Sequence, residues 1–90
     1  MRKIVTLTVA AVTLGAATAQ AGSLGKPCTS APEAQWLPMA QLQTKVEAQG
    51  YKVQKAKLKN ACGEIYTLDK NGNRVELFVD PTNGQIIGQM

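Results

Sequence analysis

Residues 63–80 read GEIYTLDKNGNRVELFVD, and this stretch decides the fold. Two runs of residues that favour β-strands, 63–68 and 74–80, flank a short polar segment that contains Asn71 and Gly72. Asn-Gly between two strands is the preferred type I′ hairpin turn, because both positions must tolerate a positive φ. The sequence therefore predicts two antiparallel strands joined by a tight turn.

The second of these strands alternates between apolar and polar side chains. Val75, Leu77 and Val79 fall on one parity, which predicts the core-facing side of a half-buried sheet. Phe78 interrupts the pattern, because it falls on the other parity with the polar residues of the strand. Two interpretations of Phe78 stay open: it is exposed for a partner, or it belongs to a second small core beneath the segment that carries Cys28.

A helix is predicted before the hairpin, over residues 36–49. Three apolar residues recur there at helical spacing: Met39, Leu42 and Val46. Pro38 suits the first helical turn, because the N–H that proline lacks is unpaired there in any case. Gly50 predicts the C-terminal stop, since glycine adopts a positive φ without penalty.

Residues 51–59 predict a third strand, in which the parity of the apolar residues changes part-way. The apolar residues are Tyr51 and Val53 on one parity and Ala56 and Leu58 on the other. A bulge near Gln54 or Lys55 would bring all four to the core side and would point Lys55, Lys57 and Lys59 outward together. This lysine row either attracts an anionic partner or protects an edge strand from pairing with other chains; the modest net charge favours protection.

The motif Asp80-Pro81-Thr82-Asn83-Gly84 predicts a further turn, and residues 85–87 predict a short closing strand. Connections this short require neighbouring strands to be antiparallel. The predicted fold class is therefore α+β: one helix packed on a small antiparallel β-sheet of three to four strands. The other face of this sheet stays partly open to water or to a partner.

Residues 1–21 have the features of a secretory signal peptide. Two basic residues precede an apolar run, and Ala19-Gln20-Ala21 is a cleavage site of the A-x-A type. The run is short for a membrane-spanning helix, which needs about 20 apolar residues. We therefore expect an exported chain, periplasmic or secreted, with a flexible lead-in over residues 22–35 and a folded domain over residues 36–90.

Cys28 and Cys62 are the only cysteines of the chain. In an oxidising compartment, two cysteines of a small domain most simply pair with each other. Because they lie far apart and form no C-x-x-C motif, a structural disulfide is favoured over a redox-active pair. A domain of this size is marginally stable and usually needs such support.

The composition argues against catalysis and against a metal site. The chain has no histidine, and its two serines, Ser23 and Ser30, both lie in the lead-in, so a Ser–His or Cys–His arrangement is excluded. A calcium loop over the polar turn is disfavoured, because Arg74 stands where such a loop needs glycine. No catalytic residue, cofactor or metal ligand is therefore predicted. After the signal peptide, eight Lys or Arg stand against six Asp or Glu, a balance that does not call for nucleic acid.

The ordered set of motifs resembles domains of the PepSY type. The motifs are Trp36-Leu37, Gln49-Gly50-Tyr51, Gly63-Glu64-Ile65-Tyr66, Asp69-Lys70-Asn71-Gly72, and Val75-Glu76-Leu77-Phe78-Val79-Asp80-Pro81 leading to Gly84-Gln85-Ile86. The Gly-Tyr pair after the helix and the Asp-Pro-x-x-Gly ending are the most specific of them. The resemblance implies a helix-plus-sheet module found outside the cytoplasmic membrane, related to segments of protease propeptides. It also implies an inhibitory or regulatory binding role, with no catalytic residues to carry over.

Together these features predict a non-catalytic binding module that regulates or inhibits a protein partner, such as a peptidase or a membrane protein, and acts as a monomer or weak dimer. The open sheet face or an edge strand would dock, because edge pairing supplies main-chain hydrogen bonds. Arg74, Glu76 and Phe78 share the outer parity of their strand and are the candidate partner-binding residues. The alternative is an accessory protein that binds a small ligand or serves a membrane redox or metal system, which only the compartment and the cysteine pair suggest.

Overall fold

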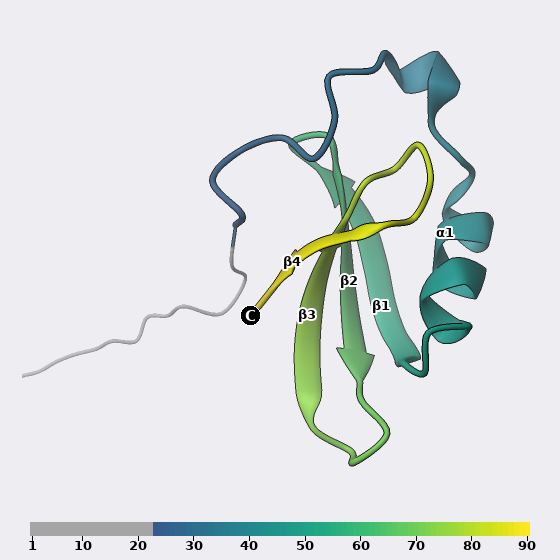
Figure 1. Cartoon of the computed structure of the whole chain (residues 1–90), viewed down its shortest axis with the longest axis vertical. Coiled ribbons are helices and arrows are strands. Elements are labelled where there is room, and N and C mark those ends of the chain that lie inside the picture. The colour runs from purple at the N-terminus through teal and green to yellow at the C-terminus, as the bar shows by residue number, and fades with distance from the viewer. Residues whose placement is uncertain (1–22) are drawn as a thin grey trace, which may run out of the picture.

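The computed structural model describes residues 23–90, so the signal peptide predicted at 1–21 lies outside the described residues. The elements in chain order are the 3-10 helix η2 (Glu33–Gln35), the helix α1 (Met39–Glu47), and the strands β1 (Lys52–Lys59), β2 (Cys62–Leu68), β3 (Arg74–Val79) and β4 (Ile86–Gln89). The strands form one antiparallel sheet in the order β1-β2-β3-β4, and α1 covers one of its faces (Figure 1). The predicted α+β architecture is confirmed.

Helix α1 is shorter than predicted at its N-terminal end. Pro38 takes an extended conformation, with φ −58° and ψ 147°, and therefore precedes the helix instead of lying within its first turn. Gly50 ends the helical turn as expected, with φ +102° and its N–H donating to the Glu47 carbonyl at 3.0 Å. No helix of the described residues is both long enough and apolar enough to cross a membrane.

Strand β1 contains the predicted bulge, which lies between Val53 and Lys55. Val53 and Ala56 both pack against the core. Residues separated by an odd number of positions point to opposite faces of a regular strand, so the bulge is what brings these two to the same face. Leu58 departs from the prediction, because it keeps 44% of its surface exposed. Its partner on β2 is Gly63, which offers no side chain to cover it.

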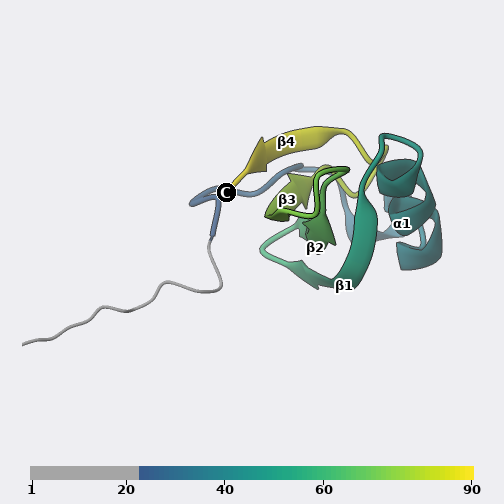
Figure 2. The same cartoon turned by 90° about the horizontal axis from the view of Figure 1, so that it is seen from below.

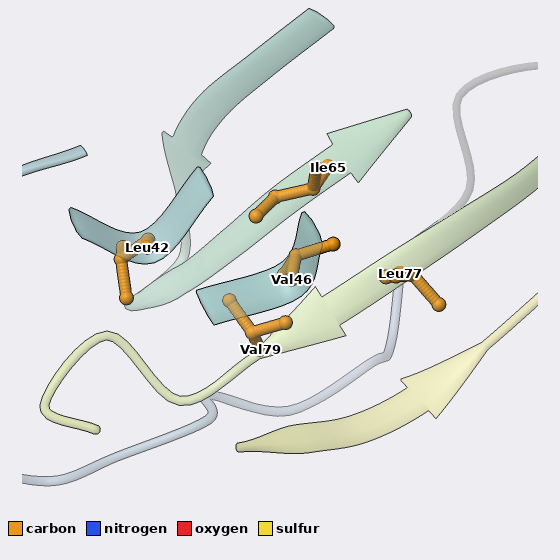
Figure 3. Close-up of a cluster of buried hydrophobic side chains, with 5 residues drawn as sticks. All are labelled: Leu42, Val46, Ile65, Leu77 and Val79. Atoms are coloured by element: carbon orange, nitrogen blue, oxygen red, sulfur yellow. The ribbon is translucent and has the colours of Figure 1, made fainter. Parts of the chain in front are cut away.

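The core is formed by buried side chains of α1, β2 and β3 (Figure 3). Five side chains with no exposed surface make up this cluster: Leu42, Val46, Ile65, Leu77 and Val79. The alternation predicted for β3 is confirmed, since two of these residues come from its core-facing parity. Burying a side chain of this size contributes about 1.5–3 kcal/mol, so a cluster of five leaves the domain little surplus stability.

The two tight turns differ from the sequence prediction in their geometry. Asn60 and Ala61, between β1 and β2, have φ values of 54° and 58°, which is the type I′ conformation. In the second turn only Gly72 has a positive φ, so the type I′ turn predicted at Asn71-Gly72 is wrong. The reason is Asp69, whose carbonyl accepts the Gly72 N–H at 2.9 Å and closes a turn with Asp first and Gly last, the type I preference.

The geometry at Ala61 gives a testable pair of substitutions. An L-residue in the left-handed region is strained, so Ala61→Gly is expected to raise the free energy of unfolding by about 0.5–1 kcal/mol after the entropy of glycine is deducted. Gly72→Ala makes the reverse exchange at φ +84°, where nothing lies within 4 Å of the new Cβ. It is expected to lower the free energy of unfolding by about 1 kcal/mol, because of backbone strain alone. Urea denaturation measures both. Shifts of the same sign would contradict the assigned turn conformations.

Asp69 also makes stability depend on pH. Its Oδ1 accepts the N–H groups of Asn73 and Asn71, each at 2.9 Å. These hydrogen bonds, that of Asn73 first, hold the pKa of Asp69 below its ordinary value of 3.8. A carboxyl whose pKa is lower in the folded state stabilises the fold above the pKa of the unfolded chain, and this contribution is lost as the pH falls through the folded pKa.

We therefore expect wild type to melt at a higher temperature than Asp69→Asn at neutral pH. The difference should shrink once the pH falls below the ordinary value of 3.8, because the carboxyl then gains a proton first in the unfolded chain and, at more acidic pH, in the folded protein. Thermal melts of both proteins over an acid pH series measure this. A difference that stays constant down to the most acidic sample would show that the charge of Asp69 does not support the turn.

Candidate functional site

The face of the sheet opposite α1, here called the second face, carries the outer-parity side chains. The register pairs Glu64 with Phe78 and Tyr66 with Glu76 across β2 and β3. On β1, the same parity is occupied by lysines, with Lys57 opposite Glu64. The second face is therefore built from charged and aromatic side chains, whereas the face under α1 is aliphatic.

The lead-in segment covers one end of the second face. A disulfide joins Cys28 to Cys62 on β2, and the segment then passes over the end of the sheet to reach α1 on the other side (Figures 1 and 2). Near its start, Leu24 approaches β4 so closely that a Cβ at Gly88 would lie 2.7 Å from it. Within the segment predicted as a lead-in, Leu24 and Cys28 thus contact the sheet.

Phe78 lies in this covered part. Its side chain has no exposed surface, and its partner on β4 is Gly88. Of the two interpretations that the sequence left open, burial in a second small core matches the structure. Phe78 therefore presents no surface to a partner in this conformation.

The other end of the second face is uncovered and hollowed. The hollow has a volume of about 510 Å³. Its lining consists of Gln54, Tyr66, Thr67, Leu68, Arg74, Val75, Glu76 and Met90. Met90, the residue after β4, completes the hollow: its N–H donates to the Glu76 carbonyl at 3.0 Å, and its carbonyl accepts the Glu76 N–H at 2.9 Å. The hollow therefore lies between the edge strand β1, the β2–β3 hairpin and the chain end.

The lining of the hollow carries one cation, Arg74, and one carboxylate, Glu76, and a lysine of β1 lies beside its aromatic side chain. Lys57 lies 5.9 Å from the ring centroid of Tyr66, within the range of a cation–π contact. The same ammonium group lies 4.0 Å from Oε1 of Glu64, a carboxylate with only 2% of its surface exposed. Arg74 is exposed at the far side. A partly apolar and aromatic lining with one cation and one carboxylate suits a ligand that carries both apolar and polar groups.

Two of the three candidate residues thus line one site. Arg74 and Glu76 border the hollow, whereas Phe78 lies outside it. Sequence reasoning did not assign Tyr66, Leu68 or Met90 to the site. The parity of β2 could have found the first two, since Tyr66 pairs with Glu76 and Leu68 with Arg74; nothing local in the sequence signals Met90.

The described part of the chain shows no arrangement suited to metal chemistry. Among residues 23–90, no three His, Cys, Asp or Glu side chains are grouped closely enough to hold an ion. Asp69 directs its carboxylate to the backbone of its own turn, and Asp80 accepts the N–H and the hydroxyl of Thr82 at 2.8 and 2.7 Å. These two carboxylates therefore stabilise their own turns by local hydrogen bonds.

The chain also matches a known family of protein domains. The family described as peptidase propeptide and YPEB domain, of the PepSY type, matches residues 5–90. The chain belongs to this family. No curated protein and no solved structure matches the chain. Domains of the PepSY family are generally non-catalytic propeptide or regulatory modules and are typically exported.

Proposed function

We propose that this PepSY protein is an exported, non-catalytic binding module that regulates a protein partner, such as a peptidase, by docking the hollow of its second face. The observation that carries the proposal is the hollow itself: an uncovered, partly aromatic depression on a sheet face, bordered by Arg74 and Glu76. Family membership supports the choice of a peptidase as partner, because the family contains peptidase propeptides. The Cys28–Cys62 disulfide is consistent with export to an oxidising compartment.

The shape of the hollow supports a protein partner. Its floor is made by side chains of strands β2 and β3, which a rigid sheet holds in place, and its open side faces away from α1. Aromatic and arginine side chains that become buried on docking dominate the energy of protein interfaces. Tyr66 and Arg74 are the two such residues here, and both line the hollow.

Capture from the exported fraction tests the proposal, with protein purified from cells that express the full chain as bait. We expect a partner that is retained by wild type, lost with Arg74→Glu and with Tyr66→Ala, and kept by Lys70→Glu. Lys70 is the matched control, since it is an exposed cation on the adjacent hairpin turn and outside the lining of the hollow. The captured protein, once purified, should lose activity on addition of wild type if it is a peptidase.

Two results would contradict the proposal. Equal capture of the partner by wild type and by both hollow variants would show that the hollow is not the docking site. If the activity of a captured peptidase is unchanged by a saturating amount of wild type, the protein does not regulate that peptidase.

A further inference from the structure

Strand β1 is an edge of the sheet, because it pairs with β2 alone. The hairpin that joins them has the two-residue loop Asn60-Ala61, and such a loop closes on a hydrogen-bonded pair, here Lys59 and Cys62. Residues alternate along an antiparallel strand, so the N–H and C=O groups of Leu58 and Ala56 point away from β2. Within residues 23–90, none of the backbone hydrogen bonds that turns and loops make reaches β1. Its outer edge therefore offers a short, open ladder.

The lysine row lies along this open ladder. Lys55, Lys57 and Lys59 occupy alternate positions after the bulge and so share the second face, where they pair with Tyr66, Glu64 and Cys62. A strand added to the edge through Ala56 and Leu58 would meet the lysines at the non-hydrogen-bonded positions. In antiparallel sheets, these are the pairs with the shorter Cα separation and the closer side chains. Acidic side chains at alternate positions of the added strand would therefore lie opposite the lysine positions, where Lys55 and Lys59 are exposed and Lys57 already contacts Glu64.

The other side of the edge is apolar. Leu58 faces the α1 side with 44% of its surface exposed, and Ala56 beside it is half-buried. An added strand that alternates would place its second set of side chains here. Apolar residues in that set would cover Leu58, which nothing on β2 covers because its partner is Gly63.

The same charges disfavour other occupants of the edge. A second copy of this chain, paired antiparallel through β1, would place lysine opposite lysine at the facing positions on the second face, and like charges opposite each other are destabilising. A membrane surface would use the ammonium groups but leave the backbone groups of Ala56 and Leu58 unpaired. The lysine row thus protects the edge against most strands while favouring an acidic one.

We propose that β1 accepts, as an added antiparallel strand, an extended partner segment in which acidic residues alternate with apolar ones. This inference rests on the proposed docking function and names the chemistry of the partner segment beside the hollow. The acidic residues pair with Lys55 and Lys59, and the apolar residues cover Leu58. A segment that continues past the bulge at Gln54 reaches the hollow, because Gln54 is part of its lining.

A synthetic peptide tests the inference independently of any natural partner. The probe is a capped peptide of about ten residues, long enough for a strand of ordinary length, in which Glu and Val alternate. The two control peptides carry Lys in place of Glu, or the same residues with every Glu before every Val. We expect saturable binding of the alternating acidic peptide alone, weakened by added salt. The amide NMR signals of Ala56 and Leu58 should shift most and should become protected from exchange.

Two variants distinguish the contribution of the lysine charges to peptide binding from that of the backbone hydrogen bonds. Lys55→Gln/Lys59→Gln should weaken binding of the probe about five-fold or more, since each opposite-charge pair on a sheet is lost. Its matched control is Lys26→Gln/Lys70→Gln, which removes two exposed lysines elsewhere and should bind as wild type. Leu58→Pro removes an outward N–H and keeps all lysines; it should abolish protection of the edge amides. Circular dichroism and thermal melts confirm that each variant is folded.

The outcomes distinguish this inference from the proposed function. Equal binding of the acidic peptide and its block control, or NMR shifts that avoid β1, would overturn strand addition. Lysine-dependent binding to vesicles with anionic headgroups, without any binding of the peptide, would overturn it in favour of a lipid surface. Partner capture that depends on Arg74 and Tyr66 but ignores Lys55→Gln/Lys59→Gln would retain the docking function and reject this inference.

Discussion

Removal of the Cys28–Cys62 bridge is expected to lower the free energy of unfolding by about 3–4 kcal/mol, because the bond closes a segment with a sequence separation of 34. The melting temperature should fall by about 15 °C or more, as a domain of this size shifts by several degrees for each kcal/mol. The bridge also holds the lead-in against the second face. Its loss therefore uncovers Phe78 and Glu64, which have 0% and 2% of their surface exposed.

Urea denaturation of wild type with and without a thiol reductant measures the effect, alongside the variant Cys28→Ala/Cys62→Ala. The variant should resemble reduced wild type and should not respond to reductant, which makes it the internal control. Binding of a dye specific for exposed apolar surface should rise in the reduced protein under folding conditions. Equal stability of oxidised and reduced wild type would show that the lead-in is held by its other contacts.

The sequence was sufficient to predict the elements, because the period of the apolar residues changes where the structure changes. Leu42 and Val46 lie about one helical turn apart, and Leu77 and Val79 follow the two-residue period of a strand. The bulge in β1 was predictable for the same reason, since the parity of the apolar residues changes there. These features depend on local pattern, and local pattern is visible in one chain.

The candidate site depended on contacts that local pattern does not encode. Phe78 and Arg74 share a parity, so sequence reasoning placed them on one surface; the lead-in then divides that surface by covering one end and leaving the other open. Met90 joins the hollow because backbone pairing with β3 continues past the predicted closing strand, as far as the hydrogen bonds between Met90 and Glu76. The turn at Asn71 was mispredicted because the side chain of Asp69 competes for the backbone N–H groups.

Truncation of Phe78 is the second large effect we expect. Phe78→Ala should lower the free energy of unfolding by about 3–5 kcal/mol, as is usual when a buried Phe is removed and its space stays partly empty. Because this loss is comparable to the stability of a small domain, Phe78→Leu serves as the graded variant. A change that keeps most of the volume should cost less than about 1.5 kcal/mol. Denaturant unfolding followed by circular dichroism measures both.

The disulfide supplies the decisive control for Phe78. If the lead-in covers the Phe78 side chain, release of the lead-in leaves that side chain partly exposed. Truncation of a partly exposed side chain lowers the free energy of unfolding less than truncation of a buried one. Phe78→Leu should therefore cost less in the Cys28→Ala/Cys62→Ala background than in wild type, a non-additivity typical of residues in contact. Equal costs in the two backgrounds would mean that other groups bury Phe78. If Phe78→Leu leaves the stability unchanged but abolishes partner capture, Phe78 is instead a docking residue.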